Sequence, residues 1–308
     1  MIGEELLERV EAGGLIAAPA PLLVMLSGGR DSVCMLDLAV RARGAGEVRA
    51  LHVDYGLRDE AEEDARHCAE LCERLGVELA VERPRREPGP GNLQAWAREQ
   101  RYAAAAALAE AAGAAIVTGH TADDQVETIL YRLASSPSRR ALLGMRPHDG
   151  RLVRPLLATT REETTAYCEE RGLRWRDDAS NEEAGYKRNL LRRNVIPELA
   201  KIHPAARENV LRTAAQLREE AELLDSLVDA ELAGGGGAIS HQRFTELHPA
   251  LRRLVLQRLA DEAAGRPVAG AARFAEQVAG LHRGGSTLDL GGGVRAVLKS
   301  GLLGAEKS

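Results

Sequence analysis

The feature that most constrains the fold is a glycine-rich hexapeptide placed between an apolar run and a helical pattern. Residues 22–26 form a short aliphatic run that predicts a buried strand, and helical periodicity begins near Ser32. Glycines let the backbone approach an anion closely, and the free amides at a helix start bind phosphate oxygens. The sequence therefore predicts a phosphate site formed by the hexapeptide Ser27, Gly28, Gly29, Arg30, Asp31 and Ser32.

The same alternation of apolar runs and helical patterns continues through the first half of the chain. It predicts strands at 48–53, 77–81 and 114–118 and helices at 32–42, 59–75 and 92–112. This alternation of strands and helices predicts an α/β fold, with a parallel Rossmann-like sheet and helices on both of its faces. Ligands of these sheets bind at the carboxyl ends of the strands.

Asp31 is the unexpected member of the hexapeptide, because a carboxylate repels phosphate unless a cation lies between them. We therefore expect Asp31 to hold Mg²⁺. The alternative is a glycine-rich turn in which a serine or aspartate only caps the helix. The chain contains neither a Walker phosphate loop nor a dinucleotide-binding Gly-x-Gly-x-x-Gly.

The length and net charge of the chain limit the number of domains and the class of protein that it can form. A chain of 308 residues predicts two domains, and its net charge of −5 argues against a protein that coats nucleic acid indiscriminately. No apolar run is long enough to span a membrane and no signal peptide is evident, so we expect a cytoplasmic protein. The pattern predicts a large domain over 1–204, a helical connector over 205–233 and a small α+β domain over 238–308.

Beyond residue 151 the sequence predicts a helix over 160–171, a short strand over 173–175 and a helix ending near Leu199. Two helices followed by short strands are predicted for the small domain. Cys68 and Cys72 lie four positions apart on one helix, where buried packing is favoured over a metal pair.

The hexapeptide resembles the Ser-Gly-Gly-x-Asp-Ser signature of the PP-loop ATP pyrophosphatases. This resemblance implies a fold like that of the adenine-nucleotide α-hydrolases. It also implies that the protein uses ATP to adenylate a carbonyl-type oxygen and releases pyrophosphate.

Further motifs resemble those of the tRNA(Ile)-lysidine synthetase family over about the first two-thirds of the chain. They are His52-Val-Asp-Tyr-Gly-Leu-Arg58, the Arg98-x-x-Arg101-Tyr102 helix, Gly119-His-x-x-Asp-Asp-x-x-Glu-Thr128, and the block from Asp177 to Arg192. Tyr55 stands where the family usually has histidine, and residues 135–140 replace an Arg-Gly-x-Gly turn. Both departures affect the expected mouth of the site.

The resemblance implies roles for individual residues. Asp124 and Glu127 lie three apart on one helical face and would hold the amine of a lysine substrate. Arg98 or Arg101 would neutralise charge developing on phosphate. His52 and His120 would contact the nucleotide, although a lone histidine is more often structural and two adjacent aspartates often only cap a helix.

A basic stripe follows these motifs. Between 187 and 218 eight basic side chains face two acidic ones, which favours docking onto RNA phosphate over an ordinary solvated helical face. The residues expected to bind RNA are Lys187, Arg188, Arg192 and Arg193.

The resemblance implies an ATP- and Mg²⁺-dependent ligase that joins L-lysine to C2 of the wobble cytidine of the CAU-anticodon isoleucine tRNA. The small domain would be a platform for the same tRNA, and a homodimer is compatible with the sequence. Two alternatives stay open: another PP-loop tRNA-modifying ATPase, such as a thiolase, and a non-catalytic tRNA-binding protein.

Overall fold

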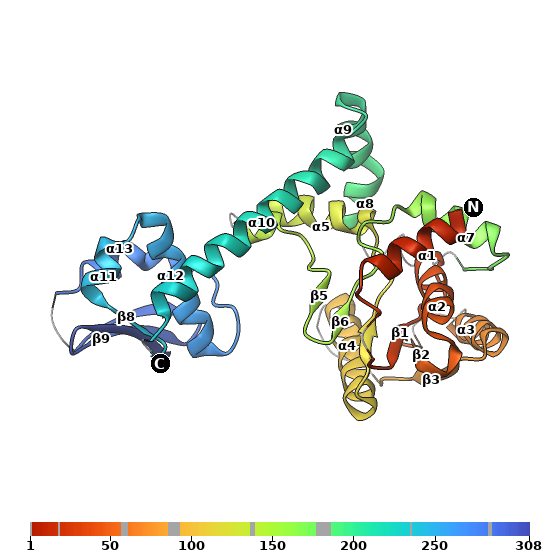
Figure 1. The fold of residues 1–308 in the computed structure, drawn as a ribbon, viewed down its shortest axis with the longest axis horizontal. Coiled ribbons are helices and arrows are strands. Elements are labelled where there is room, and N and C mark those ends of the chain that lie inside the picture. The colour runs from red at the N-terminus through yellow and green to blue at the C-terminus, as the bar shows by residue number, and fades with distance from the viewer. Residues whose placement is uncertain are drawn as a thin grey trace. The chain divides into compact units, whose positions relative to one another are not determined.

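The computed structural model describes residues 2–17, 19–56, 61–85, 93–135, 139–176, 186–234, 236–282 and 285–308. The chain divides into two compact units, Met1–Ala215 and Gln216–Ser308, and each is described by itself. Helix α10 (Ala206–Leu232) runs from the first unit into the second (Figure 1). No helix in the described ranges has both the length and the apolar character needed to cross a bilayer. The cytoplasmic location and the oligomeric state stay predictions.

A six-stranded sheet organises the first unit, in the order β3-β2-β1-β4-β6-β5. All neighbouring strands run parallel except β5 and β6, which pair antiparallel. This confirms the predicted α/β class with a mostly parallel sheet. The strands are β1 (Leu22–Met25), β2 (Val48–Val53), β3 (Glu78–Glu82), β4 (Ala115–Val117), β5 (His148–Asp149) and β6 (Leu152–Val153).

Helices cover both faces of this sheet, and strand β1 shows why. Leu22 and Val24 belong to one buried cluster, whereas Leu23 and Met25 belong to another, because successive side chains of a strand point to opposite faces. On the first face lie α1 (Ile2–Ala12), α2 (Arg30–Arg43), α3 (Ala61–Leu75) and α7 (Arg161–Glu170), and on the second α4 (Leu93–Ala112).

The remaining helices of the first unit follow β4 and α7. They are α5 (Ala122–Ser135), α6 (Arg139–Leu142), α8 (Tyr186–Leu190), a π-helical turn (Leu191–Val195) and α9 (Ile196–Ile202). Helix α7 begins with a capping box, in which the Thr160 side chain accepts from the Glu163 amide and the Glu163 side chain accepts from the Thr160 amide.

The predicted strand over 173–175 is wrong. Gly172 has φ 60°, and the Leu173 amide donates to the Cys168 carbonyl, so these residues close the end of α7. Leu173 is buried in the core of the first unit without entering a sheet. The apolar character of Leu173 is therefore explained by its packing beneath the end of α7 and not by strand pairing.

The second unit is an antiparallel sheet, of order β7-β10-β9-β8, packed against helices. Three α-helices precede its last three strands, where the sequence predicts two helices, and an unpredicted strand, β7, pairs with β10. The elements are β7 (Ala238–Ser240), α11 (His241–Glu246), α12 (Pro249–Ala264), α13 (Ala275–Ala279), β8 (Ser286–Gly291), β9 (Val294–Lys299) and β10 (Leu302–Lys307).

Candidate functional site

The glycine-rich loop lies between β1 and α2 and is closed by its two serines. The Ser32 hydroxyl donates to the Gly29 carbonyl at 2.8 Å and lies 3.0 Å from the Ser27 hydroxyl. Gly28 has φ 83°, a backbone conformation that side chains disfavour. The loop therefore presents two hydroxyls and the first amides of α2 at one point, the arrangement that binds phosphate.

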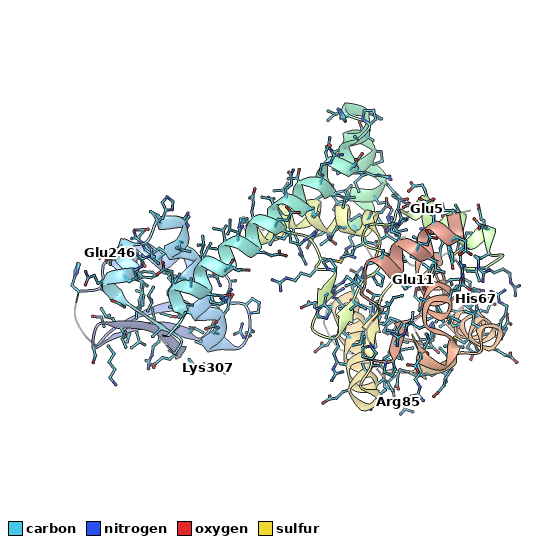
Figure 2. All side chains as sticks on the ribbon, in the orientation of Figure 1. Glu5, Glu11, His67, Arg85, Glu246 and Lys307 are labelled. Carbon is cyan, nitrogen blue, oxygen red and sulfur yellow. The ribbon has the colours of Figure 1, made fainter. Side chains whose placement is uncertain are left out.

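Helix α3 forms a side wall of this loop. A Cβ atom added to Gly28 would lie 3.3 Å from Cys68 Sγ and 3.6 Å from His67 Cδ2. His67, labelled on α3 in Figure 2, has a buried Nε2 with no hydrogen-bond partner. Burial, and then the Arg176 and Arg174 cations, lower the pKa of this histidine. The sequence motifs gave no signal for His67.

The segment after β4 touches the same loop. A Cβ atom on Gly119 would lie 2.5 Å from the Asp31 carbonyl oxygen and 3.0 Å from the Ser32 amide nitrogen. Only glycine leaves room for this approach. The two predicted motifs, after β1 and after β4, therefore meet, as neighbouring parallel strands require.

Asp31 is held by three groups. The Thr164 hydroxyl donates to Asp31 Oδ1 at 2.6 Å, and Arg30 Nε donates to the same oxygen at 3.0 Å. Arg161 Nε lies 3.8 Å from Asp31 Oδ2. The predicted phosphate-loop residue Arg30 thus contacts the loop's own carboxylate.

Asp124 and Glu127 come together on α5, and an arginine lies between them. Arg161 Nη2 donates to Asp124 Oδ1 at 2.6 Å, and Arg161 Nη1 donates to Glu127 Oε1 at 3.0 Å. Only 1% of the Glu127 side chain is exposed. Arg192, on the π-helical turn, also donates to Glu127 Oε1, at 2.8 Å. The pair predicted to hold an amine is therefore engaged by two arginines of the chain itself.

The charges in this cluster stabilise one another. Burial alone would raise the pKa of Asp124, but the Arg161 cation and the Thr121 amide lower it below its ordinary value. Burial opposes the charge of Arg161, and Asp124 and Glu127 nevertheless raise its pKa. Asp124 and Arg161 are both ionised at neutral pH.

The two predicted histidines occupy different environments. His52 is buried, with Nδ1 2.9 Å from the Leu26 carbonyl oxygen and 3.4 Å from Cys68 Sγ. His120 Nδ1 lies 2.8 Å from the Thr118 hydroxyl. Burial, assisted by nearby arginines and opposed by Asp124, lowers the pKa of His120 to about 4. His120 is therefore neutral near pH 7.

Helix α4 supplies the predicted arginine pair. The Arg98 guanidinium carbon lies 4.7 Å from the centre of the Tyr102 ring, and that of Arg101 lies 5.6 Å from it. Arg101 Nε is buried without a partner. The Tyr55 hydroxyl donates to the Ala97 carbonyl at 3.0 Å, so the residue that departs from the expected motif fastens the β2 end to α4.

The four predicted RNA-binding residues are all exposed, Lys187 and Arg188 on α8 and Arg192 and Arg193 on the π-helical turn. Arg192 also reaches back to Glu127. Arg192 is thereby linked to the carboxylate site. Several motif residues lie outside the described residues, namely Leu57, Arg58, Asn92 and the block 177–185, as do positions 136–138 of the departing loop.

The sequence interpretation missed Arg161, which contacts or approaches every predicted carboxylate of the site. The one sequence feature that could have drawn attention to Arg161 is the capping box of Thr160 and Glu163, which places Arg161 in the first turn of α7. Its partners depend on the tertiary fold, since Asp31 and Asp124 lie far from it along the chain.

Curated proteins named tRNA(Ile)-lysidine synthase are similar to this chain. That of Dehalococcoides mccartyi is 36% identical over 86% of this chain and 61% of its own length. Those of Thermus thermophilus and Pseudomonas fluorescens are each 39% identical, over 94% and 68% of this chain and 57% and 48% of their own lengths. The chain thus spans about half to three-fifths of the length of these relatives.

A solved structure supports the fold. The U34-tRNA thiolase NcsA of Methanococcus maripaludis, described with its [4Fe-4S] cluster, matches with a TM-score of 0.58 at 16% identity, over 71% of this chain and 79% of that one. The four cysteines of the present chain are buried and free, and no cluster of metal-ligating side chains occurs in the described part of the chain. The profile of the PP-loop domain, an ATP-binding family, matches residues 5–199. With that match over most of the first unit and the loop geometry above, the chain belongs to the PP-loop family.

Proposed function

We propose that this protein is a tRNA(Ile)-lysidine synthase, which uses ATP to join L-lysine to C2 of the wobble cytidine in the CAU-anticodon isoleucine tRNA. The observation that carries the proposal is that Arg161 links the carboxylate pair of α5 to Asp31 of the phosphate loop, which Gly119 approaches closely. The similarity to curated relatives of that name supports it.

The reaction has two steps. The cytidine O2 attacks the α-phosphorus of ATP, and pyrophosphate leaves. The ε-amine of lysine then attacks C2, the C2–O bond breaks and AMP leaves. Ser27, Gly28, Gly29 and Ser32 bind phosphate oxygens through amides and hydroxyls, which lie together at the start of α2.

Asp31 fits the proposed Mg²⁺, because this ion is commonly held by one or two carboxylates together with substrate phosphates. Asp31 lies within the hexapeptide, in the first turn of α2. When bound, Mg²⁺ would neutralise phosphate charge. Arg98 and Arg101 on α4 would add positive charge near the leaving groups.

Asp124 and Glu127 bind the lysine ammonium and accept its proton as the amine becomes a nucleophile. Their burial strengthens the attraction of a cation, since screening by water is reduced. Lys187, Arg188 and Arg193 contact tRNA phosphates, and the second unit, Gln216–Ser308, provides a further tRNA platform.

The test mixes purified protein, ATP, Mg²⁺, radiolabelled lysine and the isoleucine tRNA transcript. Lysine incorporation with one pyrophosphate released per lysine is expected. Asp124→Asn should reduce incorporation at least tenfold, while the control Arg174→Met, a largely exposed position, should not. Pyrophosphate release without incorporation would favour another PP-loop tRNA-modifying ATPase, and tRNA binding without either would favour a non-catalytic protein.

A further inference from the structure

Arg161 occupies the position that the proposed function reserves for the substrate amine. Its guanidinium bonds Asp124 at 2.6 Å and Glu127 at 3.0 Å, and only 18% of its side chain is exposed. An ammonium group seeking the same oxygens would meet a like charge at close range. Arg161 and Arg192 share Glu127 Oε1, so the competition concerns Asp124. Repulsion between the Arg161 guanidinium and an ammonium group at Asp124 Oδ1 is weakly screened in this buried site, and Arg161 therefore disfavours the ammonium there.

The backbone of Arg161 is fixed while its side chain is long. The Arg161 amide donates to Asp123 Oδ2 at 2.9 Å, and its carbonyl accepts from the Thr165 hydroxyl at 2.8 Å. Its Nε already lies 3.8 Å from Asp31, on the first turn after the phosphate loop. The long Arg161 side chain therefore already lies near both the carboxylate pair and the residue that closes the phosphate loop.

We propose that Arg161 is a positioning residue that fills the amine site until ATP binds and then turns to the ATP phosphates, so that lysine binds after nucleotide. The proposal rests on the proposed function. Arginine forms strong bidentate bonds with phosphate, which supplies the differential interaction that such a shift requires. Arg192 stays on Glu127 at 2.8 Å, so departure of Arg161 exposes chiefly the charge of Asp124.

The experiment measures binding of radiolabelled lysine by equilibrium dialysis, with and without α,β-methylene-ATP, whose α–β bond is not cleaved. Tested proteins are the wild type, Arg161→Met, Arg161→Lys and the control Arg174→Met, which changes an exposed arginine beside Glu70. Wild type and Arg174→Met should bind lysine at least tenfold more tightly with the analogue. Arg161→Met should bind lysine tightly without it, and Arg161→Lys should keep the nucleotide dependence.

Steady-state kinetics of Arg161→Met distinguish the proposed role of Arg161 from a purely structural one. Arg161→Met should lower kcat without raising the KM for lysine, because the amine site is open while one phosphate contact is lost. A structural role would instead raise the KM values for both lysine and ATP. Circular dichroism melting curves check that each variant is folded.

If Arg161→Met fails to fold, binding measurements on the wild type alone still test the proposal. Because linkage is reciprocal, saturating lysine must tighten binding of the analogue by the same factor. Equal lysine affinity with and without nucleotide would overturn the role of Arg161 and leave the proposed function standing. Absence of lysine binding in the presence of the analogue and tRNA would contradict the proposed function itself.

Discussion

The Tyr167 hydroxyl donates to Asp37 Oδ2 at 2.6 Å in the buried interface between α7 and α2. Arg171 Nε donates to the same oxygen at 3.2 Å. Burial and the neighbouring Asp37 raise the pKa of Tyr167, so the hydroxyl keeps its proton. This bond connects the helix that begins at the phosphate loop with the helix that carries Arg161.

We expect Tyr167→Phe to lower the free energy of unfolding by about 1–3 kcal/mol, because the buried Asp37 side chain loses a hydrogen-bond donor. Urea unfolding followed by circular dichroism measures the change. The control is Tyr131→Phe, since Tyr131 is 38% exposed. Equal stability of the two variants would show that the bond between Tyr167 and Asp37 contributes nothing.

Gly119→Ala should displace the phosphate loop, because the new methyl group would stand 2.5 Å from the Asp31 carbonyl oxygen. We expect a loss of about 1–3 kcal/mol in stability, typical of overpacking, together with at least tenfold weaker ATP binding. Isothermal titration calorimetry with ATP and urea unfolding measure both. Gly46→Ala is the matched control, because its Cβ would meet no atom within 4 Å and its φ is not positive. Unchanged ATP affinity in Gly119→Ala would contradict the predicted displacement.

Acid should destabilise the first unit partly through His120. Its pKa falls from an ordinary 6.5 to about 4 in the folded protein. Between these values the unfolded chain binds a proton that the folded chain does not, so the free energy of unfolding falls as pH falls through this window and is independent of this group above it. The full effect approaches about 3 kcal/mol, because each tenfold difference in proton affinity between the two states corresponds to about 1.4 kcal/mol.

The measurement compares wild type with His120→Gln by urea unfolding at pH 7 and pH 4.5. Loss of stability on acidification should be smaller in the variant. His148→Gln, at an exposed position, should behave as wild type. A variant that loses as much stability as wild type would show that His120 titrates normally in the folded state.

Substitutions of Arg188 and Arg192 should have different effects, although both residues belong to the same basic stretch. One should affect tRNA binding and the other should affect catalysis as well. Arg188→Gln should raise the KM for tRNA and reduce the salt dependence of tRNA binding by about one phosphate contact. Arg192→Gln should also lower kcat, since it leaves the buried Glu127 with fewer cationic partners. Filter binding at several salt concentrations and steady-state kinetics give both quantities. A purely KM effect of Arg192→Gln would place Arg192 with the RNA contacts alone.

Much of the first unit follows from local patterns in the chain. Alternating and continuous aliphatic runs predict β1 to β4 within one or two residues, because buried parallel strands need apolar side chains on both faces. Their order along the chain then brings the segments after β1 and β4 to one edge. The sequence predicts that both segments lie at this edge, whereas the pairing of β1 with β4, which brings Asp31 to Gly119, comes from the structure.

The electrostatic partners could not be predicted in the same way. The capping box places Arg161 in the first turn of α7, but nothing local identifies its partners Asp124 and Asp31, which only the fold brings near it. The wrong strand prediction at Leu173 has a similar cause. The apolar side chain is buried beneath the end of a helix, and the local sequence does not distinguish this from burial in a strand. The individual roles assigned to site residues stay predictions until the variants are measured.

The adjacency of β1 and β4 has a consequence for how such a site diversifies. In the proposed function, the segment after β1 binds the nucleotide, while the segment after β4, with α7, binds lysine. These two sides are separate stretches of chain that meet at Gly119 and at the contacts of Thr164 and Arg161 with Asp31. If these roles hold, a change of nucleophile requires changes in the second stretch, and any such change must preserve the contacts of Thr164 and Arg161 with Asp31.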